Sequence, residues 1–485
     1  MPKKFIAIII GLVVIIGGGI GAYFYFTNTP KNKYLLSEKK SYEAMNEYVG
    51  QRFESELAMQ KDMTDDSYKM GASLYANVPD ELIESMGIPA SMVNSSKIEM
   101  SAAHDPNNKT SRISINPTVA DSEIGNIVWS ADKSYQYIEA PVLKTPLKFK
   151  NAEIIKSIEK LTGEKLSDTQ GITNETLNLN TLMSSTVTQD DIDEITSRYL
   201  RFILEEIDGD KFTKGEDKVT VLGKEKTLDS VTLNLKPEDV KKLILSTLKE
   251  MKTDKDIQKI VKDTDVSIEY KKEIDDIIKE VEKAEKKEFP TIKSVIYVEG
   301  KDVQKRLMTV DFDGDALNVE MDTNIAKDID MKLVVGSNEQ PEFIQLEGSS
   351  KGKDDVKDHY TLTVGDEISA DITNKETLKD KTRQDAVVFN INADTENYVV
   401  KYDQKLMTDA KNNKQTSKGV ISFDMGGEPI QIHVDTDTVL KEKLDVKLAD
   451  AQDMNDFTEE EMNQLKQDAS SKMLGLYFTL MGAAQ

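Results

Sequence analysis

The stretch best equipped for chemistry is LMTVDFDGDALNVEMD, in which three carboxylates alternate with other residues. They are Asp311, Asp313 and Asp315, and Asp322 follows them. Carboxylates at positions 1, 3 and 5 are Ca²⁺ ligands in an EF-hand loop, which also needs glycine at position 6 and a bidentate glutamate at position 12. Counted from Asp311, position 6 is Ala316 and position 12 is the shorter Asp322. The residue that sets the loop geometry is therefore misplaced.

A β-hairpin fits this stretch better. The Asp-Gly pair at 313–314 is a preferred centre for a type I′ turn, because both of its residues need positive φ. A two-residue loop there places Val310 opposite Leu317 and Met308 opposite Val319, apolar against apolar on one face. We therefore predict a hairpin rather than a metal site, and weak Ca²⁺ binding by the acidic turn stays open.

Few other residues indicate catalysis. The chain has no cysteine, which excludes disulfides, thiol catalysis and cysteine-based zinc sites. Its three histidines, His104, His359 and His433, are far apart and belong to no metal-binding motif, so we interpret each as structural or solvent-exposed. Phosphate-binding loops and the G-x-S-x-G elbow are absent. We predict no catalytic, cofactor-binding or metal-binding residues and a protein that is not an enzyme, with a hydrolase using a carboxylate pair as the least favoured hypothesis.

The N-terminal run Phe5–Phe26 contains 22 residues without a charge. As a helix it would be about 33 Å long, enough to cross the hydrocarbon core of a membrane. No small-x-small cleavage site precedes Thr27, so we predict an uncleaved signal-anchor and not a removed signal peptide. We expect a single-pass protein of the cell membrane with its C-terminal ectodomain outside the cytoplasm, although the lysine counts on either side of the run do not decide the orientation.

The charge of the chain limits its partners. A net charge of −24 argues against a nucleic-acid partner. The expected partners are the membrane, through one transmembrane helix, and an envelope protein or a lipid-like ligand.

The apolar pattern predicts an α+β fold. After the transmembrane helix we expect one or two extended, curved antiparallel sheets with helices packed on one face. The predicted segments are an anchor at 1–31, an α+β ectodomain at 32–253, a charged helical connector at 254–289, an antiparallel β-meander at 290–450 and a C-terminal amphipathic helix at 451–485.

Two predicted helices have a clear apolar stripe. In residues 37–60 the stripe consists of Tyr42, Met45, Val49, Phe53 and Leu57. The C-terminal helix begins at a capping box of Thr458 and Glu461, and its stripe runs from Met462 to Leu480. We expect the first stripe to face a core and the C-terminal helix to be buried against the sheet.

The layout resembles a family of uncharacterised single-pass membrane proteins (a domain of unknown function) of low-GC Gram-positive bacteria. The shared features are a short lysine-bearing N-terminus, one apolar span, a juxtamembrane segment NKYLLSEKKSYE (Asn32–Glu43) and a β-rich ectodomain without cysteine. The unit VTVLGKEKTLDSVTLNLKPEDVKKLI is also similar to strand–strand–helix pieces of LolA-like envelope lipoproteins. The chain lacks the lipidated cysteine of those lipoproteins, and the resemblance supplies no site residues.

Two non-enzymatic functions remain. The first is a membrane-anchored, extracytoplasmic binding or scaffold protein of the cell envelope, with a hydrophobic ligand or a partner polypeptide on the curved sheet. Aromatic and methionine side chains of 45–93 and 473–481 would line such a surface. The second is a purely structural component of an envelope complex. A cavity would favour the first function and a flat exposed apolar patch the second.

Overall fold

The computed structural model describes residues 29–84, 87, 89–166, 172–184, 189–263, 270–393, 396–424 and 428–483. The predicted span Phe5–Phe26 lies outside these residues. The chain divides into two compact units, each assembled from separate stretches. Unit 1 comprises Met1–Glu54, Gln189–Glu376 and Val388–Asn397, and unit 2 comprises Ser55–Thr188, Thr377–Val387 and Tyr398–Gln485.

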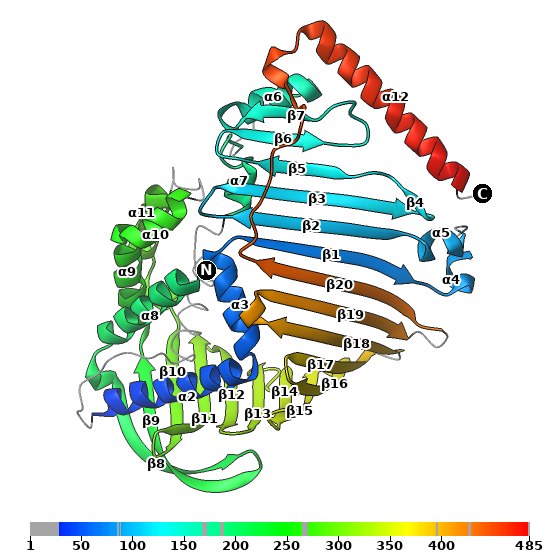
Figure 1. The fold of residues 1–485 in the computed structure, drawn as a ribbon. Coiled ribbons are helices and arrows are strands. Elements are labelled where there is room, and N and C mark those ends of the chain that lie inside the picture. The colour runs from blue at the N-terminus through cyan, green and yellow to red at the C-terminus, as the bar shows by residue number, and fades with distance from the viewer. Residues whose placement is uncertain are drawn as a thin grey trace. The chain divides into compact units, whose positions relative to one another are not determined.

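Eleven α-helices lie in the described residues and are labelled in Figure 1. They are α2 (Pro30–Arg52), α3 (Glu54–Asp65), α4 (Asp80–Glu84), α5 (Ala90–Asn94), α6 (Ile154–Thr162), α7 (Leu179–Met183), α8 (Gln189–Glu206), α9 (Pro237–Thr253), α10 (Lys255–Asp263), α11 (Tyr270–Lys283) and α12 (Glu459–Ala483).

Unit 1 is built on an antiparallel sheet whose strands pair in sequence order. They are β8 (Phe212–Val221), β9 (Lys224–Leu235), β10 (Thr291–Glu299), β11 (Asp302–Phe312), β12 (Asp315–Ile325), β13 (Ile329–Ser337), β14 (Ile344–Lys351) and β15 (Asp355–Val364). Three further strands contain residues of both units: β16 (Ile368–Lys379), β17 (Thr382–Ala393) and β18 (Glu396–Asp409).

The strands of unit 2 pair in the order β18–β19–β20–β1–β2–β3–β5–β6–β7–β21, with β4 beside β3. Only the short β7–β21 pairing is parallel among these. The strands are β1 (Tyr68–Asn77), β2 (Lys97–Asp105), β3 (Thr110–Val119), β4 (Ser122–Glu123), β5 (Ile127–Ala131), β6 (Tyr135–Glu139), β7 (Leu147–Lys150), β19 (Lys414–Asp424), β20 (Ile430–Leu440) and β21 (Gln452–Asp453).

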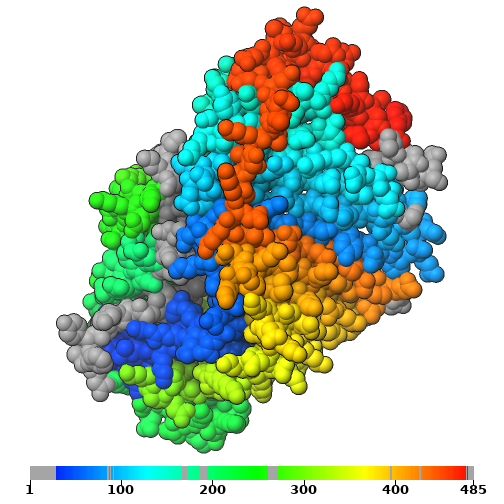
Figure 2. Space-filling view, in the orientation of Figure 1, coloured from blue at the N-terminus to red at the C-terminus, as the bar shows by residue number. Residues whose placement is uncertain are grey.

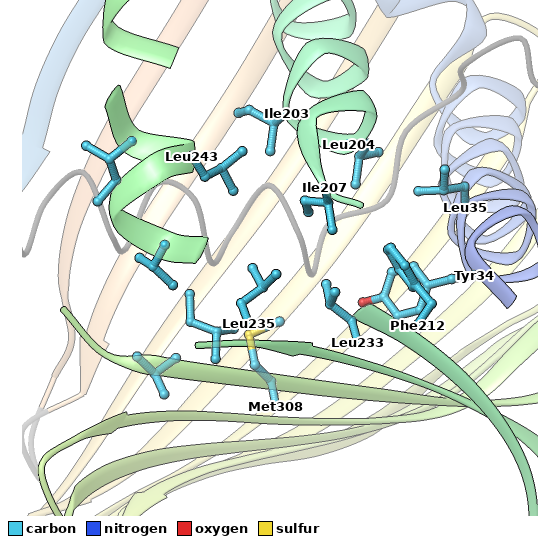
Figure 3. Packing of buried hydrophobic residues seen from close by; sticks show 14 of the residues in the cluster. Tyr34, Leu35, Ile203, Leu204, Ile207, Phe212, Leu233, Leu235, Leu243 and Met308 are labelled. Atoms are coloured by element: carbon cyan, nitrogen blue, oxygen red, sulfur yellow. The ribbon is translucent and has the colours of Figure 1, made fainter. Parts of the chain in front are cut away.

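The core of unit 1 lies between one face of its sheet and helices α2, α8, α9 and α11. Alternation along β9 sends Leu233 and Leu235 to this face, and both are fully buried. α9 starts with Pro237 at its first position, where the missing N–H costs nothing, and it buries four apolar side chains. Figure 3 shows the strand residues meeting Ile203 of α8 and Leu243 of α9.

α2 crosses the same face and meets successive strands through polar side chains. The Tyr34 hydroxyl is 2.7 Å from Ser294 Oγ on β10, Glu38 pairs with Arg306 on β11, and Arg52 Nη2 donates to Asp358 Oδ2 on β15 at 2.7 Å. A helical turn rises about 5.4 Å and strands are spaced about 4.8 Å, so each turn reaches roughly one new strand.

The predicted stripe in 37–60 is wrong about the buried face. Tyr42 and Val49 are each 38% exposed and Leu57 is 42% exposed. The helix is also interrupted at Phe53, between α2 and α3. The buried positions of α2 instead include Glu38, which the sheet holds with an ion pair. A hydrophobic pattern alone cannot identify a face that is buried through paired polar groups.

The predicted fold class also needs correction. Among the described residues no helix is long and apolar enough to cross a membrane. Strands dominate the architecture, with 21 of them in the described residues. The α+β fold headed by a transmembrane helix, the single-pass description and the cell-membrane localisation are corrected accordingly.

Among the side chains of α12 whose burial the structure describes, Met462 near its start is buried and none in its second half is. Met462 is 3% exposed and packs with Leu147, Phe149 and Met454 in a core of unit 2. In its second half Met473, Leu474 and Phe478 are 61%, 60% and 64% exposed. Figure 2 shows this helix, in red, at the surface. The expected burial along the whole stripe is therefore not observed.

Candidate ligand-binding groove

The predicted hairpin at Asp313-Gly314 is confirmed. Both residues have positive φ, 57° and 102°, and Val310 pairs with Leu317. Asp311 Oδ1 accepts a hydrogen bond from the Gly314 N–H at 2.7 Å, so this carboxylate closes the turn. In the parts of the chain that the structure describes, no group of three or more His, Asp or Glu side chains is arranged to hold a metal ion.

The sheet of unit 1 has a second face, opposite α2, which we call the polar face. Cross-strand pairs on β14 and β15 show the contrast between the two faces. Glu347 pairs with Thr361 on the polar face, whereas the next pair, Leu346 with Leu362, is on the helix face. The polar face therefore presents side chains that can form hydrogen bonds.

A groove of about 830 Å³ lies on the polar face. Its floor is formed by side chains of β12 to β15, namely Asn324, Asp330, Gln345, Glu347, Ser349, His359, Thr361 and Thr363. Most of these groups are hydroxyls, amides and carboxylates. The groove is within the size range of ligand sites but lacks their usual apolar lining.

One wall of the groove belongs to an extension of the β8–β9 hairpin. β9 pairs with β10 only from Asp229 to Leu235, whereas β8 and β9 continue to pair up to Val221 and Lys224. Residues 217–228 thus form a two-stranded projection, which we call the arm (green, near β8 in Figure 1). The arm packs on the polar face through an apolar cluster that includes Val221, Leu228, Val295 and Tyr297.

The tip of the arm is attached to β12. The Leu222 N–H donates to Asp322 Oδ2 at 2.8 Å, and Lys305 Nζ donates to Asp322 Oδ1 at 2.9 Å. Lys305 also pairs with Glu320. Although burial opposes it, these hydrogen bonds to Glu320 and Asp322 raise the pKa of Lys305, which stays charged. We call Leu222, Asp322 and Lys305 the latch.

Two titratable groups that line the groove have close partners. Lys226 Nζ donates to Glu299 Oε2 and Gln304 Oε1, both at 3.0 Å. At the other end His359 Nε2 is 2.7 Å from Asp371 Oδ2. Lys226 and His359 therefore already have partners, and the floor offers a ligand hydroxyl and amide groups beside the carboxylates of Asp330 and Glu347.

Each of the three histidines has its own neighbours. His359 lies in the groove of unit 1. In unit 2 His104 is buried, with Nδ1 2.8 Å from Ser111 Oγ, and burial lowers its pKa. His433 stacks on Tyr75 with ring centroids 4.4 Å apart. His104 fits the structural interpretation, whereas the place of His359 in a groove was not foreseen.

Sequence reasoning did not identify the groove, although a signal is present. Threonine, glutamine and serine recur with period two in QLEGSS and HYTLT, the sequences of β14 and β15. Such alternation is equally typical of an ordinary solvated face of a sheet. It indicates a groove only when the arm is known to lie beside this face. The arm itself depends on a difference in strand length that no local pattern contains.

A second cavity of about 410 Å³ lies beside α2. It is lined by Tyr48 and Arg52 of α2 and by the turns that follow β12 and β14. Arg52 is held by Asp358 and Glu376, and although burial opposes it, the hydrogen bonds from Arg52 and Ser350 lower the pKa of Asp358. This carboxylate pair is engaged in holding α2.

Comparisons with known proteins give no family. No family model matches the chain, and no curated protein matches it. Among solved structures, OmpTdeltaL8, a loop deletion mutant of OmpT, an outer membrane protein of Vibrio cholerae, is 8% identical, with 77% of this chain and 98% of that chain covered and a TM-score of 0.19. Pseudomonas aeruginosa OpdQ is 6% identical, with 77% and 96% covered and a TM-score of 0.15. TM-scores this low do not indicate a shared fold.

Proposed function

We propose that the protein is a binding protein that holds a neutral, polyhydroxylated ligand, such as an oligosaccharide, in the groove of unit 1. The main support for this proposal is the floor of the groove, where hydroxyl and amide side chains of β12, β14 and β15 lie together on one face. This replaces the hydrophobic ligand expected from the sequence, because a polar floor would leave its groups unsatisfied against an apolar molecule.

Two features support a neutral ligand over a charged one. Lys226 and His359 already have carboxylate partners, so neither is a free anion site. Asp330 lies 3.7 Å from Lys351, which offsets part of the negative charge of the floor. The hydroxyls of Thr361 and Thr363 each offer a donor and acceptors, which suits a ligand made of hydroxyl groups.

Calorimetric titration of the full chain with cello-, malto- and chito-oligosaccharides tests the proposal. The isosteric pair Thr361→Val and Thr363→Val removes two floor hydroxyls, and together they should weaken binding about tenfold, since each hydrogen bond contributes roughly 0.5–1.5 kcal/mol. Thr213→Val, an exposed change on β8, is the matched control and should not alter binding. Absence of binding by every oligosaccharide, or equal effects of floor and control variants, would contradict the proposal.

A scaffold protein is the second candidate, and one observation favours it. The second half of α12 exposes Met473, Leu474 and Phe478, which form an apolar surface on unit 2. Exposed apolar patches of this kind are typical of interaction sites. If the scaffold function holds, Leu474→Asp should abolish self-association of the full chain, measured by analytical ultracentrifugation. The threonine variants of the groove should leave that self-association unchanged.

A further inference from the structure

We propose that the arm is a clasp with two positions, closed over the groove when the latch is made and displaced when it is broken. The inference rests on the proposed function of the groove and concerns its regulation. Its basis is the combination of a projecting hairpin, an unfavourable turn at its tip and the hydrogen bond that attaches this turn to Asp322 of the sheet.

The arm is built to move as a unit. Its strands pair only with each other over residues 217–228, because the pairing of β9 with β10 begins at Asp229. A displaced arm therefore keeps its own ladder of hydrogen bonds and gives up only its contacts with the polar face. Those contacts include the apolar cluster, the latch, the ion pair of Lys226 with Glu299 and the hydrogen bond from Lys226 to Gln304.

The residue at the first position of the tip turn favours docking of the arm over formation of the turn. Leu222 and Gly223 have φ of 46° and 75°, the conformation of a two-residue hairpin loop in which asparagine is preferred at the first position. Leucine is unfavourable there because its Cβ crowds the backbone. Its side chain is partly buried in the cluster on the polar face, so the docked position offsets the strain.

Opening the latch exchanges one hydrogen bond of the Leu222 N–H for another. In the closed position Asp322 accepts from both the Leu222 N–H and Lys305 Nζ. When the tip leaves, Lys305 keeps Asp322 and Glu320 as partners, and the Leu222 N–H is free to bind water. No buried charge loses its partner, so opening avoids the large penalty of an unpaired ion. Opening also removes one wall of the groove and admits a ligand from the side.

Spin labels on introduced cysteines can measure the movement in the full chain. The chain contains no cysteine of its own that would also be labelled. Thr220→Cys on the arm and Lys357→Cys on β15 are exposed positions for the two labels. Electron–electron distance measurements should give one short distance. Leu222→Asn, which suits the turn but removes the docking side chain, and Asp322→Ala should each add a longer population. Asp315→Ala, an exposed change on the same strand, is the control and should leave the single distance.

An unchanged single distance in both latch variants would overturn the clasp. Amide hydrogen exchange gives an independent measure if a variant fails to fold. In the unaltered chain the Leu222 amide should exchange at least tenfold faster than the Leu233 amide of the central ladder, and equal rates would also overturn the proposal. Neither measurement uses a ligand, so failure of oligosaccharide binding would reject the proposed function and leave the clasp standing.

Discussion

Arg306 of β11 and Glu38 of α2 form an ion pair inside unit 1, with Arg306 Nε 3.1 Å from Glu38 Oε1 and side-chain exposures of 10% and 3%. Burial raises the pKa of Glu38, and the charge of Arg306 opposes that rise. The pair fixes the place where α2 crosses β11, about one helical turn after Tyr34 and about four turns before Arg52.

Glu38→Ala should destabilise unit 1 by about 3–5 kcal/mol, because it leaves a buried guanidinium without its partner. Replacing both members, as in Glu38→Leu with Arg306→Met, should restore most of this loss. Urea unfolding of the single and double variants measures both effects. If the double variant were as unstable as the single one, the loss would come from packing and not from the unpaired charge.

Stability should fall as the pH decreases below the unfolded-state pKa of His104, taken as 6.5. Burial lowers the pKa of His104 in the fold, and the neighbouring Asp105 opposes that effect. The unfolded chain therefore takes up the proton first, so stability is lost from about pH 6.5 downward until the folded-state pKa is passed. The difference in melting temperature between the unaltered chain and His104→Gln, measured from about pH 8 to pH 5, should show this slope. A difference that does not vary with pH would contradict it.

The two halves of α12 should respond differently to one substitution. Met462→Asp places a carboxylate in a core and should lower the melting temperature of unit 2 by several degrees. Leu474→Asp changes a side chain that is 60% exposed and should shift melting by roughly 1 °C or less. Differential scanning calorimetry of the two variants makes the comparison. Equal losses would mean that the second half of the helix is also covered.

The turn at Asp313 and Gly314 should tolerate asparagine at its first position and no β-branched residue at its second. Gly314 has φ of 102°, so Gly314→Val should cost about 1–2 kcal/mol, whereas Asp313→Asn should be nearly neutral. Thermal melts measure both changes. A Ca²⁺-dependent rise in melting temperature that Asp313→Asn abolishes would instead support the calcium loop.

Local features of the fold could be predicted from sequence. The register of the hairpin, with Met308 opposite Val319, follows from turn chemistry and alternation alone. Local apolar patterns also mark Tyr199 and Ile203 of α8 and Leu233 of β9, and these residues are buried. In each case the residues that decide the outcome are within a few positions of one another.

Features that depend on distant partners could not be predicted. Glu38 is buried because Arg306 meets it, although 268 positions separate the two residues. The segment expected to be a charged connector contains α11, which buries Ile274, Ile278 and Val281 in the core of unit 1. The groove needs the arm, the floor strands and Asp322 together, and no window of sequence contains all three.

The position of β1 in the sheet of unit 2 has a consequence for synthesis of the chain. One edge of β1 pairs with β2, which follows it closely, but the other edge pairs with β20, from Tyr68 with Leu440 to Asn77 with Gln431. Ribosomes add about 5–20 residues per second, so β20 emerges roughly 20–70 s after β1. During that interval the nascent polypeptide carries an unpaired strand edge, which is a site for holdase chaperones and for intermolecular strand pairing.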